Sequence, residues 1–505
     1  MKNTQMPAKQ TAEPRQYRLA LGALGLFILA LCAIRLLDSI ALPSASPWNL
    51  VWLGFELLLG AGAAVTALLC LFRAERRKTP SWECFREAFA QWKKPIFLVA
   101  LVWCVWSFVA CFLSVAEGRA SLSGNVRYLY YMAVSLIVIF PLGYHLGRGR
   151  RMELLHAAFD LCYAVFLLYV LYVYYRFLRG DFFFTTLGGN EFNYYIPRIR
   201  FGLNQNNTAA YSAFFLLGGF YRFRALRSGW KKALLVLSEV VFFTVFAYSE
   251  SRASIIAMAV AMGAMGGGAV YQRRKKGGVA TVLLSLLCAA AAAALTVGLI
   301  YGALHVLHVL QAAILRAGTL PAAAAAESAA SAAGNTAEGA AGDAAESAAA
   351  NNLEARGLTG GNAATLGERK TVWLAVIRDI LRDRHLLVHG CSQASVSGEV
   401  FALVGQRYNT HNQLLEVLLA YGLPALALFC VWLVWLAGKS LSLGLNRSEA
   451  GDPGWMLPPI LLLLIVNNMA ETMLVARIHF VGFLFFLLAG YTGGLAEAKK
   501  ELRNS

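Results

Sequence analysis

Two arginines and a histidine stand where polar segments meet long apolar runs. Arg252 lies in "YSESRAS", Arg369 in "GERKTVWLAVIRDIL" and His411 in "RYNTHNQLLEV". Guanidinium groups bind a diphosphate through paired, charge-assisted hydrogen bonds, and a neutral imidazole can take a proton from a hydroxyl group near neutral pH. The set therefore predicts transfer of a sugar from a lipid-linked diphosphate, with the arginines on the diphosphate and His411 as the base.

A further polar segment, "NYYIPRIRFGLNQNNTAAY", precedes another apolar run. Its Arg198 and Arg200 are predicted as additional diphosphate-binding residues. Its Asn204 and Asn206, together with Asn412 beside the histidine, are predicted to bind substrate. Each has a structural alternative, because arginines at the ends of spans extend to the membrane surface and asparagines cap helices. All these residues fall on one side of the membrane, which favours the functional interpretation.

The segments on that side show no motif for a metal or a cofactor. We find no Asp-x-Asp, no His or Cys cluster with metal spacing and no phosphate-binding glycine loop. Most of the nine cysteines lie in apolar runs, where cysteine behaves as a small hydrophobic residue. We therefore expect no metal ion and no cofactor, with fixed cations alone stabilising the departing diphosphate.

The elements that hold these residues are predicted to be membrane-spanning helices. Hydrophobic residues make up 58% of the 505 residues and charged residues 14%, far from the composition of a soluble protein. We predict an all-α polytopic membrane protein, because apolar runs of about 20 residues recur and each can cross a bilayer core of about 30 Å. The twelve predicted spans are 19–42, 49–72, 95–115, 126–147, 154–177, 207–221, 232–249, 253–271, 279–303, 413–437, 455–469 and 473–494.

The net charge of +17 follows this topology. Basic residues cluster in alternate short loops, as they do in the cytoplasmic segments of membrane proteins. Both termini are then cytoplasmic, and the longest loop, between the ninth and tenth spans, lies outside. The positive charge therefore indicates a protein surrounded by membrane lipids, with no nucleic-acid partner.

Three regions follow from the predicted spans. Residues 1–310 hold spans one to nine, residues 311–412 form one large extracytoplasmic loop, and residues 413–505 hold the last three spans and a cytoplasmic tail. Within the loop, residues 318–352 are an alanine-rich insertion, which from Pro321 onward offers no large apolar residue to bury. We expect this insertion to be mobile and to have no catalytic part.

Residues 368–384 of the loop are predicted to form an amphipathic helix near the membrane. Its apolar residues recur at helical spacing: Trp373, Val376, Ile377, Ile380 and Leu381. Arg369 falls on the same side as Trp373 and Val376, so this arginine is predicted to point toward the membrane bundle. A charged group there needs an anion or water as its partner.

At these residues the chain resembles the O-antigen ligase/O-antigen polymerase (Wzy-type) family of membrane proteins. The resemblance rests on "SESRAS", "GERKTVWLAVIRDIL" and "THNQLLEVLLAYGLPALALF", and less closely on "GLNQNNTAAY". It implies a GT-C-like, metal-independent glycosyltransferase of the cytoplasmic (inner) membrane with its active site outside. The implied donor is an undecaprenyl-diphosphate-linked glycan and the acceptor a glycan or lipid. Arg252 and Arg369 are implied to bind diphosphate, as are Arg198 and Arg200, with His411 as the base.

Three alternatives remain open on the sequence alone. A polysaccharide repeat-unit polymerase of the same family differs from a ligase only in its acceptor. A peptidoglycan-type polymerase shares the broad architecture, but no motif here singles out the acidic residue that it needs in the large outer loop. A lipid-linked sugar transporter or flippase also fits twelve spans, although transporters commonly carry internal repeats and midplane polar groups.

Overall fold

The computed structural model describes residues 94–504 apart from ten short or long gaps, at 149–151, 180–181, 188–193, 200–204, 250, 275–277, 317–362, 405–408, 446–455 and 476–479. The predicted spans 19–42 and 49–72 and the alanine-rich insertion lie outside the described residues. Two compact units are distinguished, residues 1–98 with 153–162 and residues 99–152 with 163–505. All the predicted site residues belong to the second unit.

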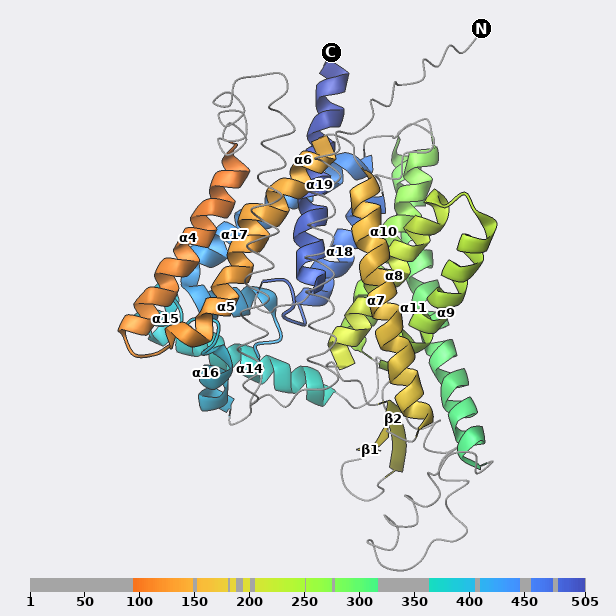
Figure 1. Cartoon of the computed structure of the whole chain (residues 1–505), viewed down its shortest axis with the longest axis horizontal. Coiled ribbons are helices and arrows are strands. Elements are labelled where there is room, and N and C mark those ends of the chain that lie inside the picture. The colour runs from red at the N-terminus through yellow and green to blue at the C-terminus, as the bar shows by residue number, and fades with distance from the viewer. Residues whose placement is uncertain are drawn as a thin grey trace, which may run out of the picture. The chain divides into compact units, whose positions relative to one another are not determined.

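The regular secondary structure of the described residues is helical except for one hairpin (Figure 1). The helices before the large loop are α4 (Pro95–Ala116), α5 (Leu122–Ala133), the π-helix η1 (Val134–Ile139), α6 (Phe140–Arg148), α7 (Met152–Leu178), α8 (Gln205–Ala225), α9 (Gly229–Ser249), α10 (Arg252–Arg273) and α11 (Val279–Arg316). Those after it are α14 (Ala363–Arg382), α15 (Arg384–Val388), α16 (Val396–Val404), α17 (Gln413–Leu445), α18 (Leu457–Asn468) and α19 (Phe480–Asn504). Strands β1 (Phe182–Leu187) and β2 (Tyr194–Ile199) pair antiparallel.

Eight of the described helical segments are long and apolar enough to cross a membrane, and α18 is a shorter apolar helix. Their positions confirm the predicted polytopic helical fold. Helix α11 continues to Arg316, well beyond the predicted end of the ninth span at residue 303. Helices α5, η1 and α6 together make one span, Leu122–Arg148, where a single span, 126–147, was predicted.

The predicted start of the last span, at residue 473, is wrong. Residues 469–475 are irregular, and α19 begins at Phe480. Side chains take the place of helical carbonyls here: Asn468 Oδ1 accepts a hydrogen bond from Met473 N at 2.7 Å, and Gln413 Oε1 accepts one from Leu474 N at 3.1 Å. Non-helical backbone is tolerated among membrane helices only when such internal partners satisfy it.

Helix α17 is interrupted in a way that joins it to two other elements. Gly422 has φ 78° and ψ −179°, a combination open essentially to glycine, and Pro424 has no N–H to continue the helical bonds. The carbonyls of Leu419 and Ala420 therefore accept hydrogen bonds from the backbone N–H groups of residues 391 and 392, at 2.8 and 2.9 Å. Trp106 Nε1 of α4 donates to the next carbonyl, that of residue 421, at 2.9 Å.

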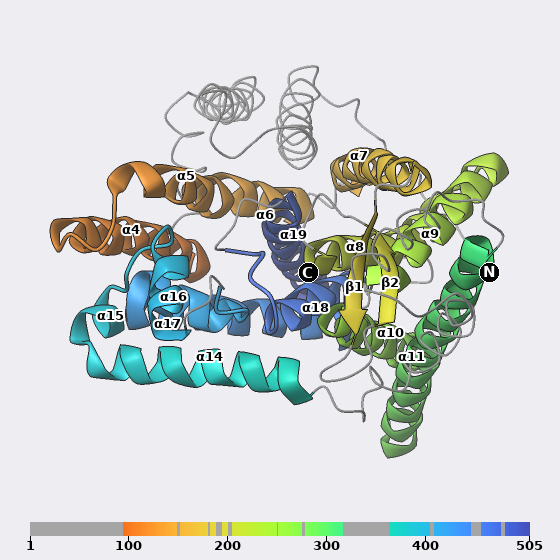
Figure 2. The same ribbon diagram turned by 90° about the horizontal axis from the view of Figure 1, so that it is seen from below.

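Helices α6 and α19 pack through glycines, and they lie side by side in both views (Figures 1 and 2). A Cβ atom at Gly143 or Gly147 of α6 would collide with backbone carbonyl oxygens of α19, and one at Gly490 or Gly494 would collide with those of α6. Small residues spaced four apart let membrane helices approach this closely. The interface fixes α19, and with it the irregular segment 469–475 that leads into it.

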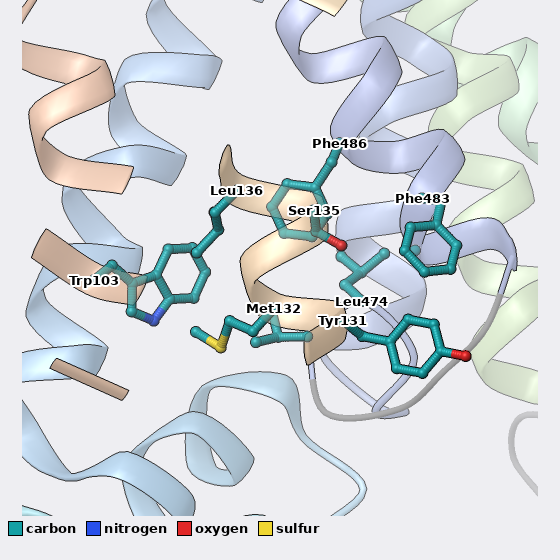
Figure 3. A pocket seen from close by; sticks show the side chains of 10 residues that line it. Trp103, Tyr131, Met132, Ser135, Leu136, Leu474, Phe483 and Phe486 are labelled. Carbon is teal, nitrogen blue, oxygen red and sulfur yellow. The ribbon is translucent and has the colours of Figure 1, made fainter. Parts of the chain in front are cut away.

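A small cavity lies beside that segment (Figure 3). Its lining includes Trp103 of α4, Ser135 of η1 and Leu474 of the irregular segment, with Phe483 of α19 on the side away from the indole. The π-helix η1 borders the cavity through Ser135 and Leu136. The cavity therefore belongs to the packing around residues 469–475.

Candidate functional site

The polar centre of the structure is the buried carboxylate of Glu471, in the irregular segment between α18 and α19. Its side chain is only 4% exposed. Oε1 accepts hydrogen bonds from Asn206 Nδ2 at 2.8 Å and Arg369 Nη2 at 3.1 Å, and Oε2 lies 3.3 Å from His411 Nδ1. A buried carboxylate is costly unless it is paired in this way. Three predicted site residues thus meet at a residue that was not predicted.

Helix α14 positions Arg369. Its buried side is formed by Val372, Val376 and Ile380, and Trp373 Nε1 donates a hydrogen bond to Thr410 O at 2.7 Å. Helix α14 contacts α17, and the two lie next to each other in the view from below (Figure 2). Arg369 Nη1 donates to Ala470 O at 2.9 Å, so the arginine reaches both the carbonyl and the carboxylate of neighbouring residues. The sequence predicted that Arg369 needs an anion or water as its partner, and the anion found in the structure is the Glu471 carboxylate.

The predicted helix at residues 368–384 is correct in kind, with two corrections. Helix α14 ends at Arg382, and Asp383 caps a new helix, α15, by accepting a hydrogen bond from His385 N at 2.8 Å. Ile377 and Leu381 were predicted on the buried side but are exposed. The buried stripe is narrower than the apolar pattern, because only one face of α14 meets other helices.

A short turn before α17 presents His411. Thr410 is held by the buried carboxylate of Glu416, which accepts from its backbone N–H at 3.2 Å and its hydroxyl at 2.8 Å. Asn412 caps α17 by accepting from Leu414 N at 3.0 Å, and its amide donates to Met469 O at 3.1 Å. Fixed on both sides, His411 has φ 49°, a left-handed conformation that a non-glycine residue adopts at a cost.

The contact with Glu471 bears on the tautomer of His411. With Glu471 ionised, its carboxylate can only accept, so in the neutral ring a hydrogen on Nδ1 faces Oε2 and the lone pair is on Nε2. A carboxylate behind an imidazole holds the ring and stabilises the imidazolium that forms when Nε2 takes a proton. The histidine side chain remains 19% exposed and that of Arg369 26%, so both remain accessible at the margin of the buried cluster.

The other predicted residues are placed as follows. Arg252 begins α10, and two residues later Ser254 Oγ donates to Asn467 Oδ1 at 2.8 Å, at the end of α18 that leads to Glu471. Arg198 lies opposite Phe183 in the hairpin, but its side chain is outside the described part, as are Arg200 and Asn204. The structure therefore brings together Asn206, Arg369 and His411, with Asn412 bound to the same irregular segment.

The sequence gives one weak indication that Glu471 belongs to the candidate site. It is the one acidic residue in the stretch from Leu457 to Phe480, "LPPILLLLIVNNMAETMLVARIHF", and an ionisable residue among spans is a functional candidate by default. Its position in a turn only a few residues long, between two predicted spans, makes it resemble an ordinary loop residue. Its burial and its three partners are properties of the fold.

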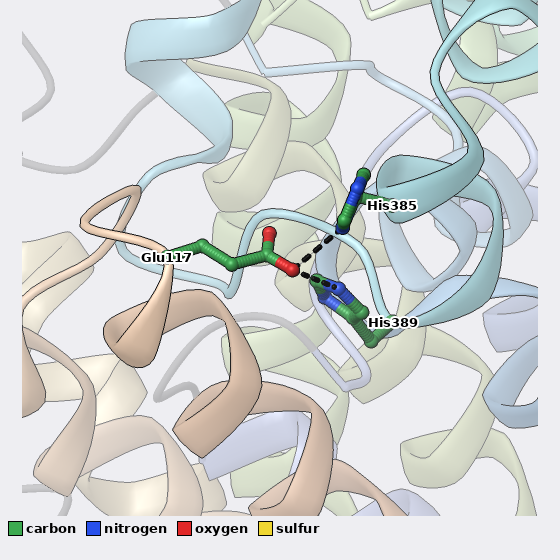
Figure 4. Close-up of side chains that lie close together, drawn as sticks. All are labelled: Glu117, His385 and His389. Carbon is green, nitrogen blue, oxygen red and sulfur yellow. Dashed lines mark hydrogen bonds and ion pairs between the residues drawn. The ribbon is translucent and has the colours of Figure 1, made fainter.

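A second cluster was also missed (Figure 4). His385 and His389 are four residues apart, a spacing that does occur in metal sites, and Glu117 Oε1 lies 2.6 Å from His385 Nδ1 and 3.0 Å from His389 Nε2. Burial raises the pKa of the Glu117 carboxyl, but hydrogen bonds and charge from the two histidines more than offset this and hold it below its usual value. The expectation of no His cluster with metal spacing is therefore corrected.

Comparison with known families agrees with the resemblance drawn from the sequence. Residues 237–430 match the family model described as O-antigen ligase. The matched region runs from α9 into α17, so it contains Arg252, Arg369 and His411, whereas Asn206 and Glu471 lie outside it. No curated protein matches the chain.

Proposed function

Because residues 237–430 match the O-antigen ligase family model, we propose that the protein is a metal-independent glycosyltransferase. It moves a glycan from an undecaprenyl-diphosphate carrier onto a sugar or lipid acceptor, on the outer side of the cytoplasmic membrane. The observation that supports this best is the meeting of Arg369, Asn206 and His411 at the buried Glu471. A cation and a base held by one carboxylate suit a reaction that releases an anion and removes a proton.

In the proposed reaction, His411 Nε2 takes the proton of the acceptor hydroxyl while that oxygen attacks the anomeric carbon. The bond from this carbon to the diphosphate oxygen breaks, and the lipid diphosphate leaves with the electron pair. Glu471 stabilises the imidazolium that forms. The chemical step balances without an oxidant, a reductant or a further reactant.

Arg369 and Arg252 are proposed to bind the departing diphosphate. A guanidinium has five N–H donors, and the contacts of Arg369 with Ala470 and Glu471 use two of them. Those contacts fix the orientation of the group before substrate arrives, which makes its electrostatic contribution larger. Arg198 and Arg200 are further candidates for the same role, and Asn204, Asn206 and Asn412 are proposed to contact the substrate.

The side of the membrane is inferred from the ends of the same helices. Asn206, Arg252 and His411 lie at the starts of α8, α10 and α17. The opposite ends of α8 and α10 carry basic residues, Arg222 with Arg224 and Arg273. Basic residues mark the cytoplasmic ends of membrane helices. This supports an extracytoplasmic site, and the alternation of basic loops along the sequence supports cytoplasmic termini.

Transport is the second candidate, and a cavity in the bundle bears on it. This cavity lies among α10, α11, α17 and α18, lined by Gly267, Tyr271, Leu436 and Pro458 among others, and no charged side chain is in its lining. A path for a sugar diphosphate needs charged groups, whereas the polar side-chain groups of this lining are only the hydroxyls of Tyr271, Ser285 and Ser440. The cavity suits an acyl or isoprenoid chain better, which favours transfer over transport.

The experiment that tests the proposed function is transfer by the purified chain from an undecaprenyl-diphosphate oligosaccharide, with sugar and lipid acceptors supplied separately. A product and released undecaprenyl diphosphate are expected. One added glycan per acceptor indicates a ligase, whereas a ladder of repeat units indicates a polymerase. If no acceptor yields product, while the chain moves the donor across a vesicle membrane, the transporter is the correct alternative.

Arg369→Ala is expected to lower kcat/KM by about 100- to 1,000-fold, because it removes a preorganised cation from the leaving group. The kcat/KM of Arg369→Lys is expected to lie between those of wild type and Arg369→Ala, because an ammonium group keeps the charge but lacks the planar guanidinium that binds two oxygens at once. Steady-state transfer kinetics measure both. Arg378→Ala, on an exposed position of the same helix, is the control. Equal activity of Arg369→Ala and wild type contradicts the proposed role.

Deletion of residues 322–350 is expected to leave the transfer rate within a factor of about three, because shortening a loop changes its closure entropy little. These residues lie in the alanine-rich insertion, outside the described part of the chain. The measurement is transfer by the deletion variant beside a variant in which a Gly-Ser linker of equal length replaces the segment. A folded but inactive deletion variant, rescued or not by the linker, gives the insertion a role in the reaction.

A further inference from the structure

The cluster of Glu117, His385 and His389 takes no part in the proposed reaction. His385 and His389 belong to α15 and the residue that caps it, and Glu117 immediately follows α4. The three ligand atoms all lie within 4.8 Å of one another, and Figure 4 shows both imidazole rings directed at the carboxylate. The cluster therefore joins two elements that are 268 residues apart in the chain.

The bonding of His389 allows a lone pair to face this cluster. Its Nδ1 lies 3.1 Å from Gly390 O and 3.5 Å from Ser114 Oγ, so a hydrogen on Nδ1 has an acceptor in the Gly390 carbonyl. Its Nε2 lies 3.0 Å from Glu117 Oε1. With the hydrogen on Nε2, this atom donates to the carboxylate; with the hydrogen on Nδ1, its lone pair faces the cluster, as binding of a metal ion requires.

The same bonding is what a metal-binding histidine shows. Such residues donate the other ring N–H to a carbonyl or carboxylate, which fixes the ring and its tautomer. His389 is 6% exposed and is held in this way by Gly390. Its partner on the helix lies four residues earlier, so the two rings share one face, as in zinc sites built on a helix.

The separations lie near those around a single ion, since all three ligand atoms are within 4.8 Å of one another. Zinc bonds of about 2.0–2.2 Å to nitrogen and carboxylate oxygen put tetrahedral ligand atoms about 3.3 Å apart, and the oxygen–nitrogen separations here are 2.6 and 3.0 Å. Binding an ion would require the ligand atoms to move slightly apart. The side chains of His385, which is 60% exposed, and Glu117, which is 28% exposed, have room to make this movement. Arg119 Nε is 3.4 Å from the other Glu117 carboxylate oxygen, and Arg119 Nη1 pairs more closely with Asp383, at 2.7 Å.

We propose that Glu117, His385 and His389 form a binding site for Zn²⁺ or a chemically similar divalent transition metal, with water as the fourth ligand. Two imidazoles and one carboxylate are a ligand set that zinc accepts. The ion fastens α15 to the end of α4. Because α15 follows α14 directly, the site braces the helix that carries Arg369. Its role is structural, and the chemistry at His411 does not pass through it.

The test uses the full-length chain, purified in detergent with an affinity tag that contains no histidine. The chain is equilibrated with Zn²⁺, freed of excess ion and analysed by mass spectrometry of the metal. About one retained zinc per chain is expected for wild type. The variant H385A/H389A is expected to lose it, and added zinc is expected to raise the unfolding midpoint of wild type by several degrees while leaving the variant unmoved. His305→Ala, on α11, is the matched control and is expected to bind zinc like wild type.

Two results overturn the proposal. If wild type retains no zinc and its unfolding midpoint does not shift, the cluster is only hydrogen-bonded. If wild type and H385A/H389A retain equal zinc, the ion is bound elsewhere in the protein. If H385A/H389A fails to fold, E117Q and H385N replace it, since both positions are partly or largely exposed. No donor or acceptor is present in these measurements, so their outcome is independent of the transfer assay. Metal independence of the transfer reaction is tested separately. The variant H385A/H389A, which lacks this site, is assayed for transfer with chelator present, and product shows that the reaction needs no metal ion.

Discussion

Replacing His411 by alanine is expected to lower the rate constant of glycan transfer by about 100- to 10,000-fold, the usual contribution of a general base. The loss is expected in kcat, because His411 is proposed to act on the acceptor proton and the arginines proposed to bind the donor are unchanged. His411 also holds a left-handed conformation, which alanine tolerates poorly. Matched folding therefore has to be established before rates are compared.

His411→Asn serves as the second variant, because asparagine adopts the left-handed conformation readily and cannot accept the proton. Unfolding midpoints and size-exclusion profiles of both variants show whether they fold, and single-turnover transfer measures the chemical step. His305→Ala controls for the loss of an imidazole elsewhere. Equal product from wild type and His411→Asn leaves the transferase in place but removes His411 as its base.

Replacing Glu471 by glutamine is expected to have the second large effect, on both stability and rate. The carboxylate is almost fully buried and accepts from two donors, and breaking a buried charge pair by removing one partner costs about 3–5 kcal/mol. The amide keeps the shape but removes the negative charge behind His411 and beside Arg369. Transfer is expected to fall at least about 100-fold, mainly in kcat.

Glu501→Gln is the matched control, because its carboxylate is 59% exposed and pairs with Arg148 at 2.8 Å. Exposed pairs of this kind contribute about 0–1 kcal/mol. Thermal unfolding and transfer kinetics are measured for both variants and for R369A/E471Q. The double variant is expected to lose less than the sum of its parts, because the two residues contact each other. Additive losses would show that Glu471 does not act through Arg369.

Local sequence patterns predicted the helices and several residues of the candidate site, whereas the contacts that join these residues at Glu471 could not be predicted from local patterns. The side of Arg369 followed from its spacing to Trp373 and Val376, because a helix repeats every 3.6 residues. The role of Glu471 did not follow from spacing, since its partners come from three distant segments. The irregular start of the last span depends on the Gln413 side chain, 61 residues away, which no local pattern contains.

The cluster of Glu117, His385 and His389 also depends partly on local sequence and partly on distant contacts. The spacing of His385 and His389 is visible in the sequence, but Glu117 joins them only because α4 and α15 both pack on α17 near its interruption at Gly422. Ile377 and Leu381 show the converse, since their apolar character predicted burial that the neighbouring helices do not provide. In each case the sequence specifies a helix face, and the fold decides what meets it.

The position of Glu471 in the chain has a consequence for biogenesis. Its partners Asn206, Arg369 and His411 precede it by 265, 102 and 60 residues. Because synthesis proceeds from the N-terminus, the guanidinium and the imidazole emerge from the ribosome and reach the membrane before their shared carboxylate exists. A chain that stops short of residue 471 carries most of its helices but leaves Arg369 without its counter-charge. Synthesis through residue 471 is thus what brings the four residues together, and a chain terminated before it is expected to be inactive in the proposed transfer.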